Sequence, residues 1–158
     1  MKAAIFLGSQ SDKAVMKKAA DLLRELGIDY YSRVVSAHRS PELLEKILAE
    51  TEQNGTEVII AGAGLAAHLP GVIASKTLLP VIGVPLASGA LNGMDALFSI
   101  VQMPKSVPVA TVGVDNAANA AFLAAEILAI KYPELRKKLE NARNTMKEEL
   151  AKDSYIDL

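Results

Sequence analysis

The sequence predicts an α/β fold with a five-stranded parallel, flavodoxin-like sheet. Two observations support this fold class. Short apolar runs alternate with segments of helical periodicity along the 158 residues, which is the pattern of strands joined by crossover helices. The apolar runs also lack a polar face, as in parallel strands that helices cover on both sides. Five such runs predict five strands, although the sequence does not fix their order in the sheet.

The first half of the chain is predicted to contain three strands and two helices. The strands are expected at residues 3–7, 30–35 and 58–61. Apolar residues recur at helical spacing over 14–26, and Gly27 is suited to end that helix. The second helix is expected to begin at Ser40 and Pro41, a capping residue followed by proline at the first helical position. Its inner face is expected to carry Leu43, Leu44, Ile47 and Leu48.

The second half is predicted to add two strands and several helices. The third strand should open into a small-residue loop over 62–69, and Pro70 is expected to start the next helix. The remaining strands are expected at 81–84 and 107–114, and the remaining helices at 95–102, 116–130 and 133–151. The segment 117–130 is apolar almost all round. Such a helix is buried either in the core or against another subunit, and we expect a homo-oligomer.

Composition excludes several classes of function. The chain has no cysteine, which rules out disulfides and thiolate chemistry and fits a reducing compartment. Its net charge is −1 and no basic cluster stands out, so no nucleic-acid partner is expected. No apolar run approaches the roughly 20 residues that cross a membrane, and the amino terminus leads directly into a strand pattern rather than a signal peptide. We therefore expect a cytoplasmic protein without a membrane partner.

Three loops are expected at one edge of the sheet. Residues 8–12, 36–40 and 62–68 each follow a predicted strand, so they leave the carboxyl ends of the strands, where open α/β sheets bind ligands. The first loop offers hydroxyls and free N–H groups at a helix start, which suit a phosphate, and Asp12 could bind sugar hydroxyls. The alternative is a capped turn in which Ser11 and Asp12 serve only the helix.

His38 and Arg39 lie side by side in the second loop. An imidazole donates and accepts protons near neutral pH, and a guanidinium can bind a phosphate with two parallel hydrogen bonds. The alternative is a surface loop with two ordinary polar residues. His68, in the third loop, is either a second acid or base or a residue that lines the ligand or supports the loop. Two histidines without a carboxylate cluster make a poor metal site, so no metal is expected.

Five motifs in this order resemble those of one family. They are Gly8-Ser9-Gln10-Ser11-Asp12, Ser36-Ala37-His38-Arg39-Ser40-Pro41-Glu42, Gly62-Ala63-Gly64-Leu65-Ala66-Ala67-His68-Leu69-Pro70-Gly71, Ala90-Leu91-Asn92-Gly93 and Ser99-Ile100-Val101-Gln102-Met103-Pro104. With them the chain resembles the PurE family of N5-carboxyaminoimidazole ribonucleotide mutases, from the first strand to about residue 130. It departs from the family at Leu65, where glycine is common, at residues 87–89, and in the tail after 130.

The resemblance implies a fold and an assembly. The fold would be a three-layer α/β sandwich, and the assembly would typically be an octamer with its sites at subunit contacts. The partner would be a small-molecule ribonucleotide, and neither a cofactor nor a metal would be needed. We expect a single catalytic domain over residues 1–158, in which residues 133–158 form a C-terminal helical tail.

The resemblance also implies a reaction in purine biosynthesis. A carboxylate moves from the exocyclic nitrogen of N5-carboxyaminoimidazole ribonucleotide to carbon 4 of its ring. By motif, His38 would be the catalytic proton shuttle. The ribose phosphate would be bound by Ser9, Asp12 and Arg39. The rest of the site would be lined by Ser11, Ser36, Gly64, His68 and Leu69.

Two other functions stay open. A sister class shares the fold and the loop histidine but carboxylates aminoimidazole ribonucleotide directly with carbon dioxide. Arginine rather than lysine after His38 favours the mutase class by resemblance. The second alternative is a nucleotide-binding module without catalytic activity, and the intact pair of His38 and Arg39 argues against it.

Overall fold

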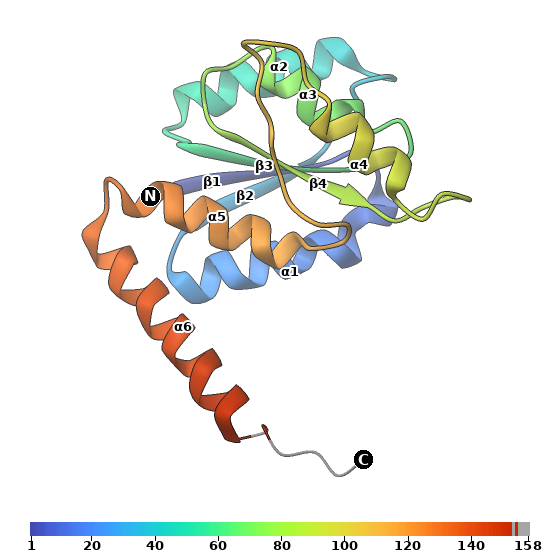
Figure 1. The fold of residues 1–158 in the computed structure, drawn as a ribbon. Helices are drawn as coiled ribbons and strands as arrows, with labels where there is room; N and C mark the ends of the chain where they lie inside the picture. Colours follow the sequence, from blue (N-terminus) through green and yellow to red (C-terminus); the bar gives the residue numbers. More distant parts are fainter. Residues whose placement is uncertain (153, 155–158) are drawn as a thin grey trace.

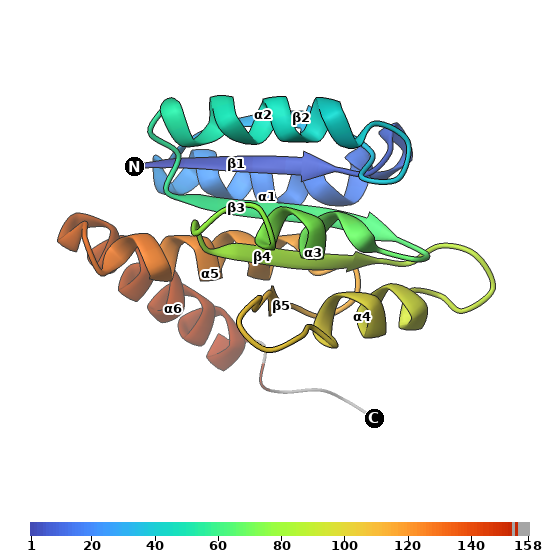
Figure 2. The same ribbon diagram turned by 90° about the horizontal axis from the view of Figure 1, so that it is seen from above.

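Five parallel strands form one sheet with the order β2-β1-β3-β4-β5 in the computed structural model, which describes residues 1–152 and 154 (Figure 1). The strands are β1 (Lys2–Leu7), β2 (Asp29–Val34), β3 (Val58–Gly64), β4 (Val81–Leu86) and β5 (Ala110–Thr111). β1, β3 and β4 run side by side in one direction (Figure 2). This order is the flavodoxin-like one, so the predicted fold class is confirmed.

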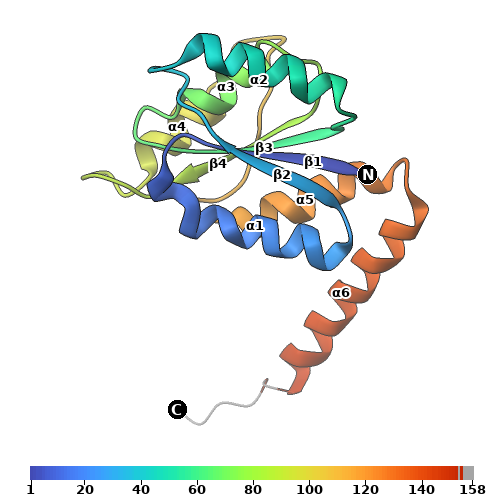
Figure 3. The same ribbon diagram turned by 180° about the vertical axis from the view of Figure 1, so that it is seen from behind.

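Helices cover both faces of the sheet and complete a three-layer sandwich. The helices are η1 (Gln10–Asp12), α1 (Lys13–Leu26), α2 (Pro41–Gln53), α3 (His68–Ala74), α4 (Met94–Val101), α5 (Ala117–Ala129) and α6 (Pro133–Lys152). Helices α2, α3 and α4 lie on one face, and α1 and α5 lie on the other (Figure 1). Two separate clusters of buried apolar side chains fill the space between these layers and the sheet. Helix α6 begins beside α5 and extends away from the sandwich (Figure 3).

The helix boundaries follow the local sequence. Helix α1 ends at Gly27, whose φ of 73° is the left-handed conformation that glycine adopts without a steric penalty. Helix α2 begins with Pro41 at its first position, as predicted, although the side chain of Ser40 makes no capping hydrogen bond. The prediction for Leu43 is wrong, because its side chain is 48% exposed. The buried positions of α2 repeat at intervals of three and four residues, and Leu43 lies one residue outside that stripe.

Several strand predictions need correction. β2 is mostly exposed, so the expectation that every strand is apolar on both faces is wrong for this edge strand. β3 continues through Gly64, because its last residues still pair with β4, and residues 62–64 are therefore not a loop. β5 is limited to Ala110–Thr111 rather than 107–114, and α3 begins at His68, two residues before Pro70.

Much of the apolar surface of α5 is covered within the chain. Its buried residues pack in the cluster shared with α1 and the sheet, and they are Ala117, Ala120, Ala121, Ala124, Ala125 and Leu128. The alanines allow the helix to approach its neighbours closely. The next residue after the helix, Ile130, is 87% exposed. Burial in the core of the chain therefore accounts for most apolar residues of α5, and the homo-oligomer remains a prediction.

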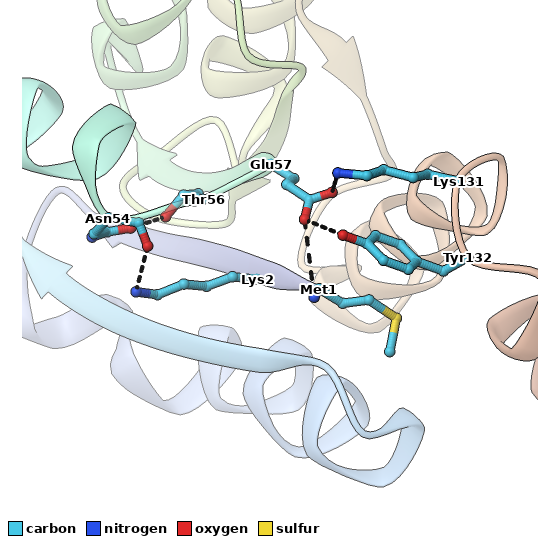
Figure 4. Close-up of polar contacts among 7 residues, drawn as sticks. All are labelled: Met1, Lys2, Asn54, Thr56, Glu57, Lys131 and Tyr132. Carbon is cyan, nitrogen blue, oxygen red and sulfur yellow. Dashed lines mark hydrogen bonds and ion pairs between the residues drawn. The ribbon is translucent and has the colours of Figure 1, made fainter.

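The amino end of the sheet carries a paired polar network (Figure 4). Glu57, just before β3, accepts a hydrogen bond of 2.7 Å from the Tyr132 hydroxyl and one of 3.4 Å from Lys131. The amino group of Met1 lies 3.9 Å from the same carboxylate. Because Lys131 and Tyr132 belong to the connection between α5 and α6, this network fastens the carboxyl-terminal helices to the sheet.

Candidate functional site

A cleft of about 440 Å³ opens at the carboxyl end of the sheet, opposite the Glu57 network. The segments that follow β1, β2, β3 and β4 all contribute to its walls. Every site residue predicted from the sequence lines it, namely Ser9, Ser11, Asp12, Ser36, His38, Arg39, Gly64, His68 and Leu69. Residues separated by up to 60 positions therefore meet in one place, because parallel strands deliver their carboxyl ends to the same edge.

The turn after β1 is ordered by its own side chains. The Ser9 backbone N–H donates to Asp12 Oδ2 at 2.9 Å, and the Ser11 hydroxyl donates to Asp12 Oδ1 at 3.2 Å. Ser9 Oγ also accepts from the Ser11 backbone N–H at 3.4 Å, and Ser9 and Asp12 together form a capping box. The capping alternative and the site are thus compatible, since the same side chains that cap the turn also line the cleft.

Burial raises the pKa of Asp12, and the hydrogen bonds from Ser11 and Ser9 oppose that rise. Desolvation disfavours the charged carboxylate, whereas donors stabilise it. A partly desolvated carboxylate gains from further hydrogen-bond donors, and hydroxyl groups of a ligand are suitable ones. Asp12 is therefore suited to bind a polar, uncharged group.

Arg39 is held at the cleft by neutral groups. Its Nε donates to Ser36 Oγ at 3.2 Å, and one terminal guanidinium nitrogen donates to the Gly8 carbonyl oxygen at 3.4 Å. These bonds join the ends of β1 and β2. Within residues 1–152 and 154, Arg39 forms no salt bridge with a carboxylate. Its positive charge is therefore available for an anion.

His38 and His68 form a pair of rings across the cleft. His38 Nε2 is hydrogen-bonded to His68 Nδ1, and the ring planes meet edge to face at 83° with centroids 4.4 Å apart. In such a bond one ring donates an N–H and the other accepts it with a lone pair, and the tautomers determine which ring does which. The contact between His38 and His68 was not predicted from the sequence. The contact follows from the strand order, because β2 and β3, which precede the two histidines, both flank β1.

A fourth segment, after β4, was missed as part of the site. Ser88 lines the cleft, and so does Leu65, which has a φ of 53° and a side chain that is 54% exposed. A Cβ atom on Gly89 would lie only 2.8 Å from Leu65 Cδ2, so the two loops are in close contact. The base of the segment is fixed by Asp115, whose Oδ1 accepts from the Ala87 N–H at 2.9 Å. The position of residues 87–93 directly after β4 was the sequence feature that could have indicated it.

The part of the chain that the structure describes holds no cluster of three or more histidine, cysteine, aspartate or glutamate side chains arranged to bind a metal. Across those same residues, none of the helices has both the length and the apolar character needed to cross a lipid bilayer.

The chain is similar to known proteins over almost its whole length. A family model described as AIR carboxylase matches residues 2–149. The N5-carboxyaminoimidazole ribonucleotide mutase of Pyrococcus abyssi is 59% identical over 92% of this chain and 84% of its own length. The mutase of the same name from Escherichia coli K12 is 51% identical over 94% and 89%. The crystal structure of Treponema denticola PurE has a TM-score of 0.89 at 28% identity and covers 96% of this chain and 95% of its own.

Proposed function

The chain belongs to the AIR carboxylase family, and from that premise we propose that it is an N5-carboxyaminoimidazole ribonucleotide mutase of purine biosynthesis. Several relatives at 51–59% identity carry that name. The observation that carries the proposal is the hydrogen-bonded pair of His38 and His68 in the same cleft as Arg39. A group that transfers protons and a free cation are the two elements that this rearrangement of an anionic nucleotide requires.

His38 acts first as an acid and then as a base. As imidazolium it protonates the carbamate nitrogen, the bond from that nitrogen to the carboxyl carbon breaks, and its electron pair stays on nitrogen. Carbon dioxide is then free beside the neutral aminoimidazole, and carbon 4 attacks it. Neutral His38 removes the proton from carbon 4, which restores the aromatic ring and the imidazolium. One residue thus ends the cycle in the state in which it began.

His68 positions His38 for these transfers. The hydrogen bond between the two rings fixes the orientation of the His38 imidazole. His68 is a positioning residue in this scheme, since it acts through His38 rather than on the carboxyl group.

The remaining residues hold the nucleotide still while carbon dioxide moves. Arg39 and Ser9 bind the phosphate, and Asp12 binds the ribose hydroxyls. The wall formed by the end of β3 and the start of α3 contains Ala63, Ala67 and Leu69, which are buried and apolar. It offers no nucleophile to compete for carbon dioxide, and it limits the entry of water. A fixed ring beside a dry wall keeps the carboxyl carbon within reach of carbon 4.

The second candidate is a carboxylase that uses aminoimidazole ribonucleotide and carbon dioxide directly, because the matching family model carries the description AIR carboxylase. A spectroscopic assay separates the two. The purified protein receives the N5-carboxylated ribonucleotide in one cell and aminoimidazole ribonucleotide with bicarbonate in the other. Rapid formation of the 4-carboxylated product from the first alone supports the mutase, and turnover of the second alone supports the carboxylase. A folded protein that is silent in both would support a binding module.

The proposal includes a homo-oligomer, with an octamer as its expected size. A hollow of about 730 Å³ between α5 and α6 is lined partly by Phe122, Leu123 and Met146, and a second copy would cover these apolar side chains. Light scattering that shows a monomer at working concentration would contradict this. A single domain with a tail over 133–158 is also proposed, although residues 153 and 155–158 lie outside the described residues. A cytoplasmic location is proposed because a chain without cysteine suits a reducing compartment.

A further inference from the structure

Ser88 carries a buried hydroxyl that the proposed mechanism does not use. Its Oγ is covered and has no hydrogen-bond partner among the residues that the structure describes. Most buried hydroxyl groups in proteins are paired, so an unpaired one in a cleft wall needs an explanation. Ser88 lines the same cleft as the two histidines. The residue is thus placed to meet a ligand.

Gly64 makes room for this hydroxyl. A Cβ atom built on Gly64 would lie 2.5 Å from Ser88 Oγ and 3.3 Å from the Leu86 carbonyl oxygen. The register explains the proximity, because Gly64 pairs with Leu86 at the end of β3 and β4, two residues before Ser88. The bond from the Ala87 N–H to Asp115 holds the segment at its base. The position of the Ser88 backbone is therefore determined by the sheet and not by a free loop.

The strand order shows which part of a nucleotide would reach Ser88. Arg39 follows β2 and Ser88 follows β4, and β1 and β3 lie between them. Three strand spacings separate the two ends by roughly 14 Å. The cleft includes both residues, so a ribonucleotide whose phosphate lies at Arg39 would extend its ribose and then its base along this direction. The base therefore lies toward the ends of β3 and β4, where His68 and Ser88 are found.

We infer that Ser88 binds the migrating carboxyl group, donating a hydrogen bond from its hydroxyl to one carboxyl oxygen. This inference rests on the proposed mutase function and on the phosphate lying at Arg39. Serine turns its hydroxyl by rotation about one bond, here from the space beside Gly64 that it occupies toward the cleft. The hydrogen bond retains carbon dioxide after the bond to nitrogen breaks, so that attack by carbon 4 is faster than escape.

The test is the fate of carbon dioxide in Ser88→Ala. Purified parent and variant are given N5-carboxyaminoimidazole ribonucleotide, and both the 4-carboxylated product and aminoimidazole ribonucleotide are measured, with the rate without enzyme subtracted. We expect the ratio of escape to transfer to rise about fivefold, as for the loss of a hydrogen bond between neutral groups, because the carbon dioxide that escapes is neutral. We also expect the Tm of the free protein to stay equal or rise, because an unpaired buried hydroxyl is removed.

Ser75→Ala is the matched control. The Ser75 hydroxyl donates to the Val72 carbonyl oxygen at 2.8 Å, outside the cleft, so its removal should leave the ratio unchanged. An active parent with the same ratio in Ser88→Ala would overturn the inference. A lower Tm with an unchanged ratio would make the hydroxyl structural and would overturn it too. An inactive parent would instead refute the mutase function itself.

Gly64→Ala tests the same subsite by a second route. The added Cβ displaces the Ser88 hydroxyl, so escape should rise as in Ser88→Ala. In the double variant, which combines Gly64→Ala with Ser88→Ala, the Ser88 oxygen that collides with the new Cβ is absent. The closest remaining atom of residue 88 is then its own Cβ, 3.5 Å from the added one. The effect of Gly64→Ala on the ratio should therefore be smaller in the Ser88→Ala background than alone. Fully additive effects would show that the two residues do not act on one subsite.

Discussion

The polar side chains are paired with one another at the amino end of the sheet and are incompletely paired at its carboxyl end. At the amino end, Glu57 is satisfied by Tyr132, Lys131 and the terminal amino group (Figure 4). At the carboxyl end, Arg39 has only neutral partners, and the Ser88 hydroxyl has none among the described residues. The first arrangement stabilises the folded chain by itself, whereas the second has polar groups that a bound ligand would satisfy.

The two carboxylates show the same contrast. Desolvation raises the pKa of Glu57, but the hydrogen bonds and charges of Tyr132, Lys131 and Met1 together lower it below its usual value. Desolvation is the largest influence on the pKa of Asp12 too. There the hydrogen bonds from Ser11 and Ser9 do not outweigh it, so the pKa is raised. The folded protein thus favours the charged form at one end and disfavours it at the other. Substitutions at the two ends should separate stability from activity.

The largest effect is expected for His38→Asn. Asparagine cannot carry a proton between nitrogen and carbon, so conversion of the N5-carboxylated ribonucleotide should fall by at least about 100-fold. The side chain is exposed, so the Tm should be unchanged, and the substrate should still bind through Arg39. Single-turnover rates, binding and thermal melting on the same preparation check all three. A rate near that of the parent would refute the proton-shuttle role.

Much of the fold was predictable because it depends on local patterns. Alternating strands and helices gave the architecture, and Gly27 and Pro41 marked helix ends through their backbone geometry. The errors concern properties that depend on neighbours. Exposure of β2 follows from its place at the edge, and β5 is short because only Ala110 and Thr111 pair with β4. Neither can be read from the composition of a strand.

The site was predictable as a set of residues but not as a set of contacts. All nine predicted residues lie at or just after the carboxyl ends of β1, β2 and β3, which a parallel sheet brings to the same edge. The bond between His38 and His68 depends on strand order, which was open. Ser88 was missed because its significance comes from the missing side chain of Gly64, and that proximity exists only once β3 and β4 are paired.

A smaller loss of activity is expected for Arg39→Lys. Lysine keeps the positive charge but cannot reach Ser36, Gly8 and a phosphate with one planar group. KM should rise about tenfold while kcat changes less, because a ground-state binding contact is lost. Inhibition by ribose 5-phosphate should weaken in parallel. Arg33→Lys is the control on the preceding strand, where the side chain is exposed and lies near Glu50; there both constants should match the parent.

The reverse pattern is expected for Tyr132→Phe at the amino end. The variant loses the 2.7 Å hydrogen bond to Glu57, so the free energy of unfolding should fall by about 1 kcal/mol. Turnover well below the melting temperature should be unchanged, since the residue is at the other end of the sheet. Urea unfolding and the mutase assay measure the two effects. A loss of activity without a loss of stability would contradict the separation of the two ends.

The smallest expected effect is on the pH dependence of stability. Glu57 has a folded pKa below its unfolded value of about 4.3. Its stabilisation is therefore present above that unfolded value and is lost as the pH falls through the folded pKa. Asp12 has a folded pKa above its unfolded value of about 3.9, so stability falls as the pH rises from that value through the folded pKa.

The two carboxylates therefore oppose each other in the same acidic range, and single substitutions should reveal each in turn. In Glu57→Gln the decline of stability on acidification should be shallower than in the parent, because the group that loses its favourable charge is gone. In Asp12→Asn the decline should be steeper, because the opposing contribution is removed. Urea unfolding at intervals between pH 3 and pH 6 measures both slopes, and at neutral pH Glu57→Gln should be the less stable of the two. Equal slopes in the two variants would mean that folding does not shift the pKa values of Glu57 and Asp12 in opposite directions.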